Sequence, residues 1–364
     1  MAELIESLNT TSEQTPWTEI RDRAVLDKNP LVSVMMITYN HAPYISRAIE
    51  GVLQQITNFP FELVIGEDCS TDDTREIVFE YKKKYPGIIR VITSEKNVGA
   101  KKNAYRTGKA CRGRYLAFCE GDDYWHVPDK LKKQVDYLEN NPECGLVYSS
   151  YDVYHSSNNK TIKDFIKYRK WEIIENPKIT DYFIVFKPIG GRRVGILTCT
   201  VMIREKLYKQ IIESDPYLYI SDHFISGDIQ IWAEVINISS IHFIPDSLAT
   251  YRLTEESATR SKDIINVLRL HESAAELWVY MCKKYNFPSE IVCKYEKHRQ
   301  NVLLKLAYYT RNAELAENLK KIKNRWSYLE WLRYYGAKNV LFYNIYLVAW
   351  NFKNIFTKEN EEWQ

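Results

Sequence analysis

The sequence predicts an α/β fold, in which a mixed, mostly parallel sheet is flanked by helices and a helical extension follows at the C-terminal side. Three observations support this prediction. Short apolar, β-branched runs alternate with amphipathic segments between residues 31 and 154. Acidic residues follow two of these runs. From about residue 262, apolar residues recur at helical spacing.

The composition is that of a globular protein. Of 364 residues, 45% are hydrophobic and 27% charged, and 50 basic against 47 acidic residues give a net charge of +3. Because the basic and acidic residues are so evenly balanced, the net charge predicts no nucleic-acid partner. Seven cysteines without a CxxC pair indicate reduced thiols in a cytoplasmic protein. We expect neither a signal peptide nor a membrane-spanning helix.

The predicted elements begin at residue 31, after a polar lead-in over 1–30 that we expect to be loosely ordered. A strand over 31–38 is followed by a helix with Pro43 near its start. The strands that follow are predicted at 61–68, 87–93, 114–120 and 144–154, and the helices between them at 70–85, 99–111 and 127–141. This alternation is typical of βαβ units.

The pattern is weaker beyond residue 155. We expect a strand over 196–203, a helix from Asp228 to about residue 236 and two short strands within 241–253. One apolar stripe is predicted in the helical region, formed by Ile264, Val267, Leu268, Ala275, Trp278 and Met281. We therefore divide the chain into the lead-in (1–30), a domain over 31–255 with halves 31–154 and 155–255, and a helical region over 262–364.

Glu120, Asp122 and Asp123 lie directly after the predicted strand 114–120. In βαβ sheets, ligands bind outside the carboxyl ends of the strands. Clustered carboxylates there can share a hard cation such as Mg²⁺ or Mn²⁺, usually together with phosphate oxygens. Gly121 lets a ligand approach the backbone closely. The alternative is that the acids only cap the next helix, although three acids exceed what a cap needs.

Polar residues also end the two earlier strands. Asp68, after Glu67, is placed to accept a hydrogen bond from a base or a ribose. Residues 70–73 are assigned to helix capping. Tyr39, after the strand 31–38, is placed to lie against a planar base. His41 is interpreted as a surface histidine.

Four stretches together resemble the family 2 glycosyltransferases of bacterial polysaccharide type, which are inverting enzymes of the Rossmann-related GT-A fold. They are "TYNHAPY" (38–44), "GEDCSTDDT" (66–74), "RYLAFCEGDDYW" (114–125) and "GDIQIWAEV" (227–235). The resemblance covers about residues 31–255 and is strongest over 31–154. Their order and spacing are more specific than any one of them.

The resemblance implies a role for each site residue. It implies nucleotide binding by Thr38, Tyr39, Glu67, Asp68 and Asp122. It implies that Asp122 holds a divalent metal, Mg²⁺ or Mn²⁺, with Glu120 and Asp123. Glu67 and Glu120 replace the family's usual aspartates.

Asp228 matches the family's catalytic base, while Gly227 replaces an acid often found before it. A helix N-cap is the structural alternative for Asp228. Asp222 and Asp215 are nearby acids that are alternatives for the base.

The implied reaction moves a sugar from a nucleoside-diphosphate sugar, with a UDP-sugar favoured, to a hydroxyl acceptor such as a growing surface glycan or a lipid-linked oligosaccharide. One alternative is a non-catalytic nucleotide- or carbohydrate-binding homologue. Another is a sugar-1-phosphate nucleotidyltransferase, which would need a Gly- and Arg-rich loop after the first strand. "TYNHAPY" is not such a loop.

Several basic residues have two interpretations, anion contact or solvation. They are Lys101, Lys102, Arg192, Arg193, Arg252 and Arg260. The aromatic segment 338–356 is interpreted as a helix packed on the protein or on a partner, or as an interfacial membrane helix. The second interpretation predicts peripheral contact with the inner face of the plasma membrane. The sequence leaves a homo-oligomer open.

Overall fold

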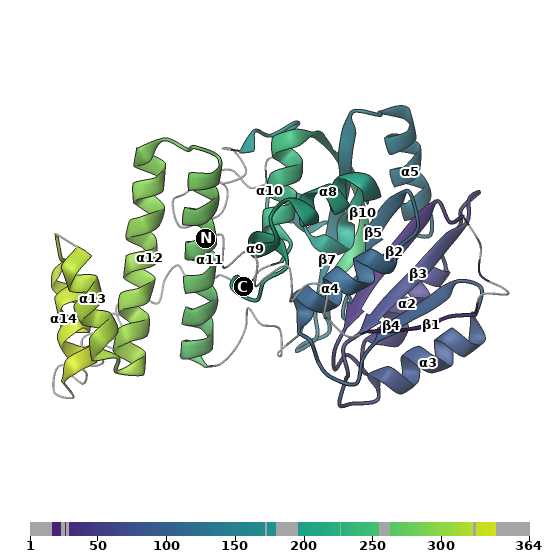
Figure 1. Ribbon diagram of the computed structural model, residues 1–364. Helices are drawn as coiled ribbons and strands as arrows, with labels where there is room; N and C mark the ends of the chain where they lie inside the picture. The colour runs from purple at the N-terminus through teal and green to yellow at the C-terminus, as the bar shows by residue number, and fades with distance from the viewer. Residues whose placement is uncertain are drawn as a thin grey trace. The chain divides into compact units, whose positions relative to one another are not determined.

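The computed structural model describes residues 17–22, 26, 29–171, 173–179, 196–225, 227–254, 263–322 and 325–339. The chain divides into two units, Met1–Glu255 and Glu256–Gln364 (Figure 1). Each unit is described by itself.

In its described part, the first unit contains a ten-stranded mixed sheet of order β1-β4-β3-β2-β5-β9-β7-β10-β6, with β8 paired to β7. The strands are β1 (Thr18–Ile20), β2 (Val32–Thr38), β3 (Phe61–Glu67), β4 (Ile89–Thr93), β5 (Tyr115–Phe118), β6 (Tyr124–Trp125), β7 (Cys144–His155), β8 (Lys160–Ile162), β9 (Met202–Arg204) and β10 (Ser240–Leu253). Strands β4, β3, β2 and β5 are mutually parallel, as are β7 and β10. The carboxyl ends of β4, β3, β2 and β5 therefore lie along the same side of the sheet.

Helices cover the sheet on both faces (Figure 1). They are α2 (Ile45–Leu53), α3 (Thr74–Lys84), α4 (Ala100–Ala110), α5 (Lys130–Asn140), α6 (Phe165–Tyr168), the 3₁₀ helix η1 (Thr198–Thr200), α8 (Glu205–Ser214), α9 (Pro216–Tyr219) and α10 (Ile229–Ile238). The predicted helices at 99–111 and from Asp228 onward are confirmed as α4 and α10.

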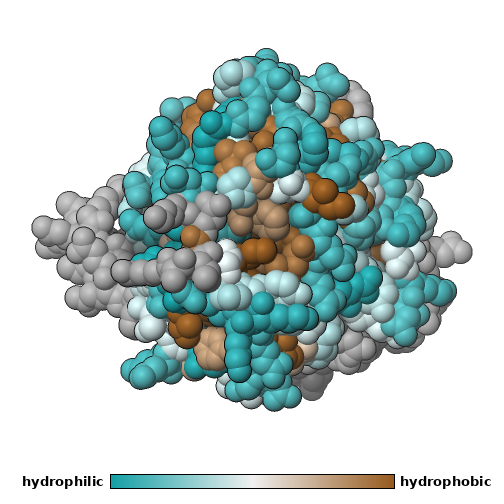
Figure 2. Space-filling view, turned by 90° about the vertical axis from the view of Figure 1, so that its right-hand side faces the viewer, coloured by the Kyte–Doolittle hydropathy of each residue, from teal (hydrophilic) through white to brown (hydrophobic). Residues whose placement is uncertain are grey.

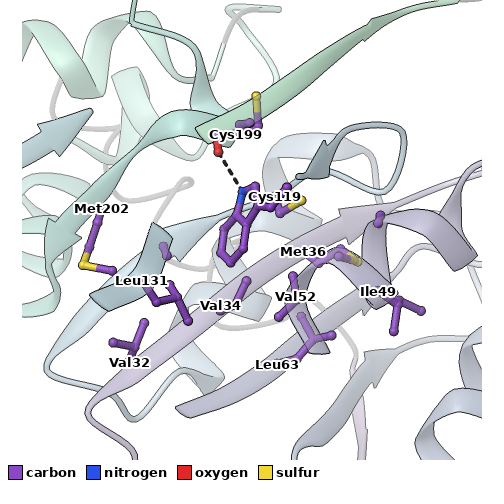
Figure 3. Close-up of a cluster of buried hydrophobic side chains, with 14 of the residues drawn as sticks. Val32, Val34, Met36, Ile49, Val52, Leu63, Cys119, Leu131, Cys199 and Met202 are labelled. Carbon is purple, nitrogen blue, oxygen red and sulfur yellow. Dashed lines mark hydrogen bonds between the residues drawn. The ribbon is translucent and has the colours of Figure 1, made fainter. Parts of the chain in front are cut away.

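The alternation of side chains along β2 divides the core between the two faces of the sheet. Val32, Val34 and Met36 point to one face and pack with Ile49 and other buried residues (Figure 3). The indole of Trp125 lies within this cluster, and its Nε1 donates to the carbonyl of Cys199 at 2.9 Å. A buried indole needs such a partner for its N–H. Outside the core, Figure 2 shows one mainly hydrophilic face with hydrophobic residues gathered near its middle.

Three segments differ from the predictions. The predicted loosely ordered lead-in contains β1, which pairs antiparallel with β4. Its Glu19 accepts a hydrogen bond from the buried Arg90, a partner that no local pattern indicates. The two short strands expected within 241–253 are one strand, β10, with irregular pairing between Ile244 and Ser247. The expected strand over 196–203 is η1 followed by β9.

The described part of the second unit is helical, as predicted. It consists of α11 (Ile264–Lys284), α12 (Ser289–Thr310), α13 (Ala313–Ile322) and α14 (Tyr328–Lys338). Of the predicted stripe on α11, Leu268, Ala275, Trp278 and Met281 are buried, whereas Ile264 is exposed. None of the helices described is long and apolar enough to cross a membrane. Most of the aromatic segment 338–356 lies outside the described residues.

Candidate active site

The acid loop, defined as residues 119–123, continues from β5 along the end of β2. The backbone N–H of Cys119 donates to Met35 at 3.1 Å, and that of Gly121 donates to Ile37 at 3.0 Å. A Cβ at Gly121 would lie 2.6 Å from Thr38 Oγ1 and 2.8 Å from His41 Nδ1. Only glycine fits at this position, so the loop is held tightly against the carboxyl end of β2.

The three carboxylates of the acid loop have different surroundings. Asp123 is only 3% exposed, and its Oδ1 accepts a hydrogen bond from the backbone N–H of Arg252 at 2.8 Å. Burial, and then the charges of Asp122 and Glu120, raise the pKa of Asp123 well above its usual range. Asp123 therefore anchors β10 to the acid loop, and its role as a metal ligand stays a prediction.

Glu120 differs from Asp123, because one of its carboxylate oxygens lacks a hydrogen-bond partner among the described residues. Within the described part of the chain, its buried Oε2 makes no hydrogen bond. Burial, followed by the charge of Asp122, raises the pKa of Glu120 to about 8, and Asp228 contributes in the same direction. Asp122 itself is partly exposed, and its backbone carbonyl accepts from Arg252 Nε at 2.8 Å. A cation or a hydrogen-bond donor beside Glu120 would relieve this repulsion.

The residues present fit a divalent metal only with help from a ligand. Among the described residues, no group of three His, Cys, Asp or Glu side chains is arranged to hold a metal ion. Mg²⁺ is often held by one or two carboxylates plus substrate phosphates. Asp122, together with the unpaired oxygen of Glu120, matches that smaller donor set.

Asp228 is both a helix cap and part of a cavity wall. It is the N-cap of α10, where its Oδ1 accepts from the backbone N–H of Ile229 at 2.8 Å. Its Oδ2 accepts from the hydroxyl of Thr198 at 2.9 Å. The structural and the catalytic interpretations of Asp228 are therefore compatible, because the cap fixes the carboxylate in place.

A cavity of about 210 Å³ lies between β2, β5, α4, α8 and α10. Its charged residues are Asp228, Glu120 and Lys101, and hydroxyl groups come from Thr198, Tyr105, Tyr208 and Tyr219. Most of the remaining wall is apolar and aromatic, with Met35, Phe118, Tyr208, Ile231 and Trp232 among its residues. The fold thus brings the end of β5 and the start of α10, more than 100 residues apart in sequence, to one cavity.

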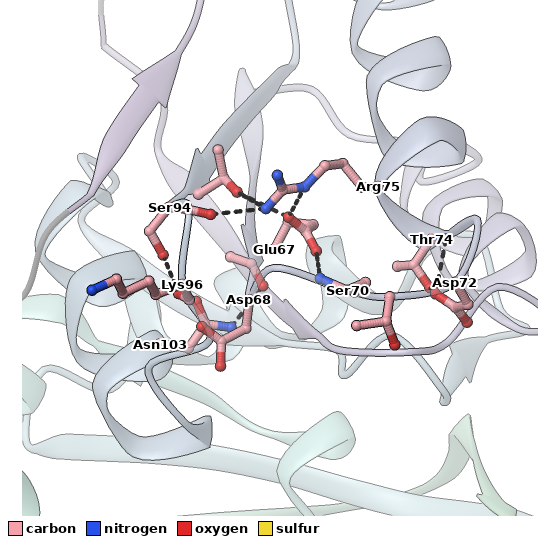
Figure 4. A network of polar contacts seen from close by, with 12 residues as sticks. Glu67, Asp68, Ser70, Asp72, Thr74, Arg75, Ser94, Lys96 and Asn103 are labelled. Atoms are coloured by element: carbon pink, nitrogen blue, oxygen red, sulfur yellow. Dashed lines mark hydrogen bonds and ion pairs between the residues drawn. The ribbon is translucent and has the colours of Figure 1, made fainter.

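Asp68 and Glu67 bind other parts of the protein (Figure 4). The carboxylate of Asp68 accepts from the backbone N–H groups of Val98 and Gly99, at 3.0 and 2.9 Å, and from Arg106 at 3.1 Å. It therefore holds the start of α4 against the end of β3. These contacts point to an indirect role in ligand binding for Asp68.

Glu67 is completely buried. Burial alone would raise the pKa of Glu67, but hydrogen bonds from Ser70, Thr93 and Arg75 outweigh it and lower the pKa. The Arg75 ion pair is 2.7 Å long. Like Asp68, Glu67 organises the loops around the sheet edge and has no exposed surface for a nucleotide.

Tyr39 is the most accessible of the predicted nucleotide-binding residues, with 41% of its surface exposed, whereas Thr38 is buried. A hydrogen bond to Asp72 holds the loop after Tyr39 in place. Its Ala42 N–H donates to Asp72 at 3.0 Å, and Asp72 also accepts from the N–H of Thr74 at 3.0 Å. Of residues 70–73, which were predicted to cap this helix, Asp72 thus contacts the start of α3, whereas the N-cap residue Asp73 makes no side-chain cap hydrogen bond in the described part of the chain. The ring of Tyr39 remains accessible to a ligand.

The lysines at the start of α4 bind the loop before α10. Lys101 donates to the carbonyl of Ser221 at 3.0 Å, and burial lowers its pKa to about 8. Lys102 pairs with Asp222. Asp215 caps α9 through the N–H of Leu218 at 3.0 Å. Both alternative bases therefore have structural contacts, and neither lines the cavity.

Arg252 has a role that the sequence did not indicate. Besides its two contacts with the acid loop, its guanidinium lies 4.9, 5.3 and 5.1 Å from the ring centres of Tyr44, Tyr124 and Tyr154. Arg252 therefore connects β10 to the acid loop.

Thr198 is also not indicated by the sequence, because "ILTCTVMI" is typical of a plain strand. Arg192, Arg193 and Arg260 lie outside the described residues.

Comparison with known proteins agrees with this arrangement. The family profile described as "Glycosyl transferase family 2" matches residues 33–210. An uncharacterised protein of Mycobacterium tuberculosis is 44% identical over 117 residues, which is 32% of this chain and 34% of the relative. The chain thus matches about a third of the length of this relative. The Escherichia coli UDP-Glc:alpha-D-GlcNAc-diphosphoundecaprenol beta-1,3-glucosyltransferase WfgD is 29% identical over 64% of this chain and 81% of its own.

Solved structures share the fold. Residues 1–349 of S. aureus TarS superpose with a TM-score of 0.51 at 17% identity, over 88% of this chain and 91% of that one. The mannosyltransferase PcManGT from Pyrobaculum calidifontis, in complex with GDP-Man and Mn²⁺, gives 0.50 at 14% identity, over 98% and 95%. The mixed sheet flanked by helices is therefore GT-A-like, as predicted.

Proposed function

Because residues 33–210 match the profile described as "Glycosyl transferase family 2", we propose that this chain is an inverting glycosyltransferase. It moves a sugar from a nucleoside-diphosphate sugar to a hydroxyl acceptor. The observation that carries the proposal is that Asp228 and Glu120 line one cavity at the carboxyl ends of β2 and β5. That edge is where α/β sheets bind their ligands.

Asp228 acts as the base in the proposed reaction. The acceptor oxygen bonds to the anomeric carbon as the bond to the diphosphate breaks, and the hydroxyl proton passes to Asp228. The cap contact to Ile229 and the hydroxyl of Thr198 orient the carboxylate. A fixed carboxylate has little freedom to lose when the acceptor arrives, which favours proton transfer.

The donor is bound at the ends of β2, β3 and β5. Tyr39 stacks on the base, while Thr38, Glu67 and Asp68 fix the surrounding loops. Asp122, assisted by Glu120, would hold Mg²⁺ or Mn²⁺, which supplies Lewis-acid stabilisation of the departing diphosphate. A UDP-sugar is favoured, in line with the UDP-Glc in the name of WfgD. The Mn²⁺ in the PcManGT complex supports a divalent ion.

The acceptor is proposed to be a growing surface glycan or a lipid-linked oligosaccharide, the latter in line with the diphosphoundecaprenol in the name of WfgD. Peripheral contact of the second unit with an anionic bilayer fits this acceptor. Ile322, which ends α13 directly after Lys320 and Lys321, is 63% exposed, and Tyr328, which begins α14, is 75% exposed. Aromatic and basic side chains together suit a lipid interface.

Flotation with phosphatidylglycerol vesicles tests this contact. Binding to the vesicles should weaken in a Lys320→Glu, Lys321→Glu variant. Unchanged flotation of the variant, or no flotation of the wild type, would contradict the contact.

A thermal-shift experiment tests the main proposal. UDP and GDP are added with and without Mn²⁺ to the wild type, to Asp122→Asn and to the surface control Asp222→Asn. At a hundredfold excess over Kd, a ligand adds about 2.7 kcal/mol of stability, which corresponds to a shift of several degrees in Tm. We expect a Mn²⁺-dependent shift with UDP in the wild type and the control, and its loss in Asp122→Asn. No shift with either nucleotide would contradict the proposal.

A further inference from the structure

Arg252 carries a buried positive charge that no carboxylate neutralises directly. It is only 7% exposed. Asp123 accepts from its backbone N–H, and Asp122 accepts from its Nε through a backbone carbonyl, so neither carboxylate pairs with the guanidinium. Among the described residues, Arg252 has no ion pair, and neither of its Nη groups makes a hydrogen bond. A buried charge without a partner is costly, so a bound anion would stabilise this site.

The two Nη groups of Arg252 are accessible to such an anion. The polar atoms that are fully buried and lack a partner in the described part of the chain do not include them. Since they make no hydrogen bond either, they must reach the protein surface. The guanidinium therefore presents an open hydrogen-bonding edge at the carboxyl end of β10.

Aromatic rings hold the guanidinium of Arg252 in place. The ring centres of Tyr44, Tyr124 and Tyr154 lie 4.9, 5.3 and 5.1 Å from its central carbon. On α2, Arg47 stacks on the ring of Tyr124 at 3.7 Å. Arg47 is exposed and has no carboxylate partner among the residues that the structure describes. Two guanidinium groups thus lie around one tyrosine ring, which makes this a positively charged site with little freedom to move.

This arginine pair, Arg47 and Arg252, is distinct from the cavity beside Asp228. Neither arginine lines that cavity, whereas Glu120 of the acid loop does. Two residues further along the loop, Asp122 contacts Arg252. An anion at the arginine pair would therefore lie near Asp122, the proposed metal ligand.

A phosphate group suits this position. Guanidinium groups bind phosphate oxygens through paired N–H donors, and a divalent cation held by carboxylates also binds phosphate oxygens. We propose that Arg252, assisted by Arg47, binds a phosphate group of a substrate beside the acid loop. The two sources are the diphosphate of the donor and the diphosphate that links the acceptor to a lipid. This inference rests on the proposed function, because it names the substrate group that the arginine pair recognises.

Titration calorimetry in the presence of Mn²⁺ tests the inference in two arms. The donor arm measures the Kd of uridine and of UDP. The acceptor arm measures the Kd of geranyl diphosphate, a soluble polyprenyl diphosphate, on protein saturated with UDP. Both arms use the wild type, Arg252→Lys, Arg47→Gln and the control Arg325→Gln. Arg325 is an exposed arginine of the second unit.

The two variants remove different parts of the site. Arg252→Lys keeps the charge but loses the planar fork of N–H donors, and Arg47→Gln removes an exposed charge that makes no hydrogen bond to the acid loop. Loss of a hydrogen bond to a charged group weakens binding about tenfold. We expect this factor in one arm for Arg252→Lys, and about threefold in the same arm for Arg47→Gln. Uridine should bind all four proteins equally, and Arg325→Gln should change no Kd.

The arm that weakens identifies whether the phosphate belongs to the donor or to the acceptor. If neither variant changes the Kd of UDP or of geranyl diphosphate, while the wild type binds UDP, the inference is overturned and the proposed function stands. Equal weakening of uridine and UDP would also overturn it, because Arg252 would then only support the loops around the nucleoside. Absence of UDP binding by the wild type would overturn the proposed function, and this inference with it.

Discussion

The substitution Asp68→Asn tests the claim that Asp68 is a buried anchor for α4. The side chain is 2% exposed and accepts hydrogen bonds from Val98, Gly99 and Arg106. Its ion pair with Arg106, 3.1 Å long, is buried on both sides. Asparagine has nearly the same shape, but it leaves the charge of Arg106 unpaired and points an N–H group at a backbone donor.

Breaking a buried ion pair by removing one partner costs about 3–5 kcal/mol. Because Arg106 also donates to the backbone carbonyl of Glu67 at 3.0 Å, we expect the lower end, a loss of about 3 kcal/mol in the free energy of unfolding. Urea unfolding followed by circular dichroism measures this loss as a lower midpoint with an unchanged m value.

The control for this experiment is Asp222→Asn, which breaks a surface ion pair with Lys102. The carboxylate of Asp222 lies on a side chain that is 63% exposed, so its loss should cost less than about 1 kcal/mol. If Asp68→Asn costs no more than this control, Asp68 is not an anchor. Its assignment would then return to direct contact with the nucleotide.

Three further predictions concern a buried acid, a buried base and a glycine. Burial would raise the pKa of Glu62, but Arg112, Arg90 and Ser33 lower it, so its stabilisation is present above the unfolded pKa of about 4.3 and is lost as the pH falls through the folded value. Glu62→Gln should therefore destabilise more at pH 7 than at pH 3.5, and urea unfolding at both pH values measures this difference. Burial lowers the pKa of Lys130 to about 7, below its unfolded value of about 10.4, so the stability of the wild type should rise between these pH values. Thermal unfolding at pH 6 and pH 10 should show this rise in the wild type but not in Lys130→Met, and an equal change in stability in both proteins would contradict the lowered pKa. Gly121→Ala places a Cβ 2.6 Å from Thr38 Oγ1, which should displace the acid loop and weaken Mn²⁺-dependent UDP binding at least about tenfold. Calorimetry measures this affinity, and an unchanged value would contradict the tight packing of the loop.

The central strands were predictable because their signal is local. Buried parallel strands such as β2 and β3 are continuous apolar runs, and each is followed by an amphipathic helix. Strand β1 has no such signal, since its three residues are stabilised by pairing with β4 and by the contact of Glu19 with Arg90. The irregular pairing within β10 likewise depends on its partner β7.

The candidate site was predictable to the level of the chain segments but not of each side chain. Sequence placed Glu120, Asp122 and Asp123 together, yet only the fold shows that Asp123 turns toward the backbone of Arg252. In the same way, nothing local in the sequence distinguishes a ligand-binding Glu67 from one paired with Arg75. Thr198 and Trp232 reach the cavity through long-range packing, which sequence spacing does not encode.

The proposed mechanism depends on Asp228 as the base. Asparagine is as good an N-cap as aspartate, so Asp228→Asn should keep the contact with Ile229 and leave the fold intact. The decisive measurement is kcat for sugar transfer from the UDP-sugar in the wild type and in Asp228→Asn, with the Kd of UDP measured on both. We expect a loss of about 10²–10⁴ in kcat with unchanged UDP affinity. Turnover of Asp228→Asn at the wild-type rate would contradict it.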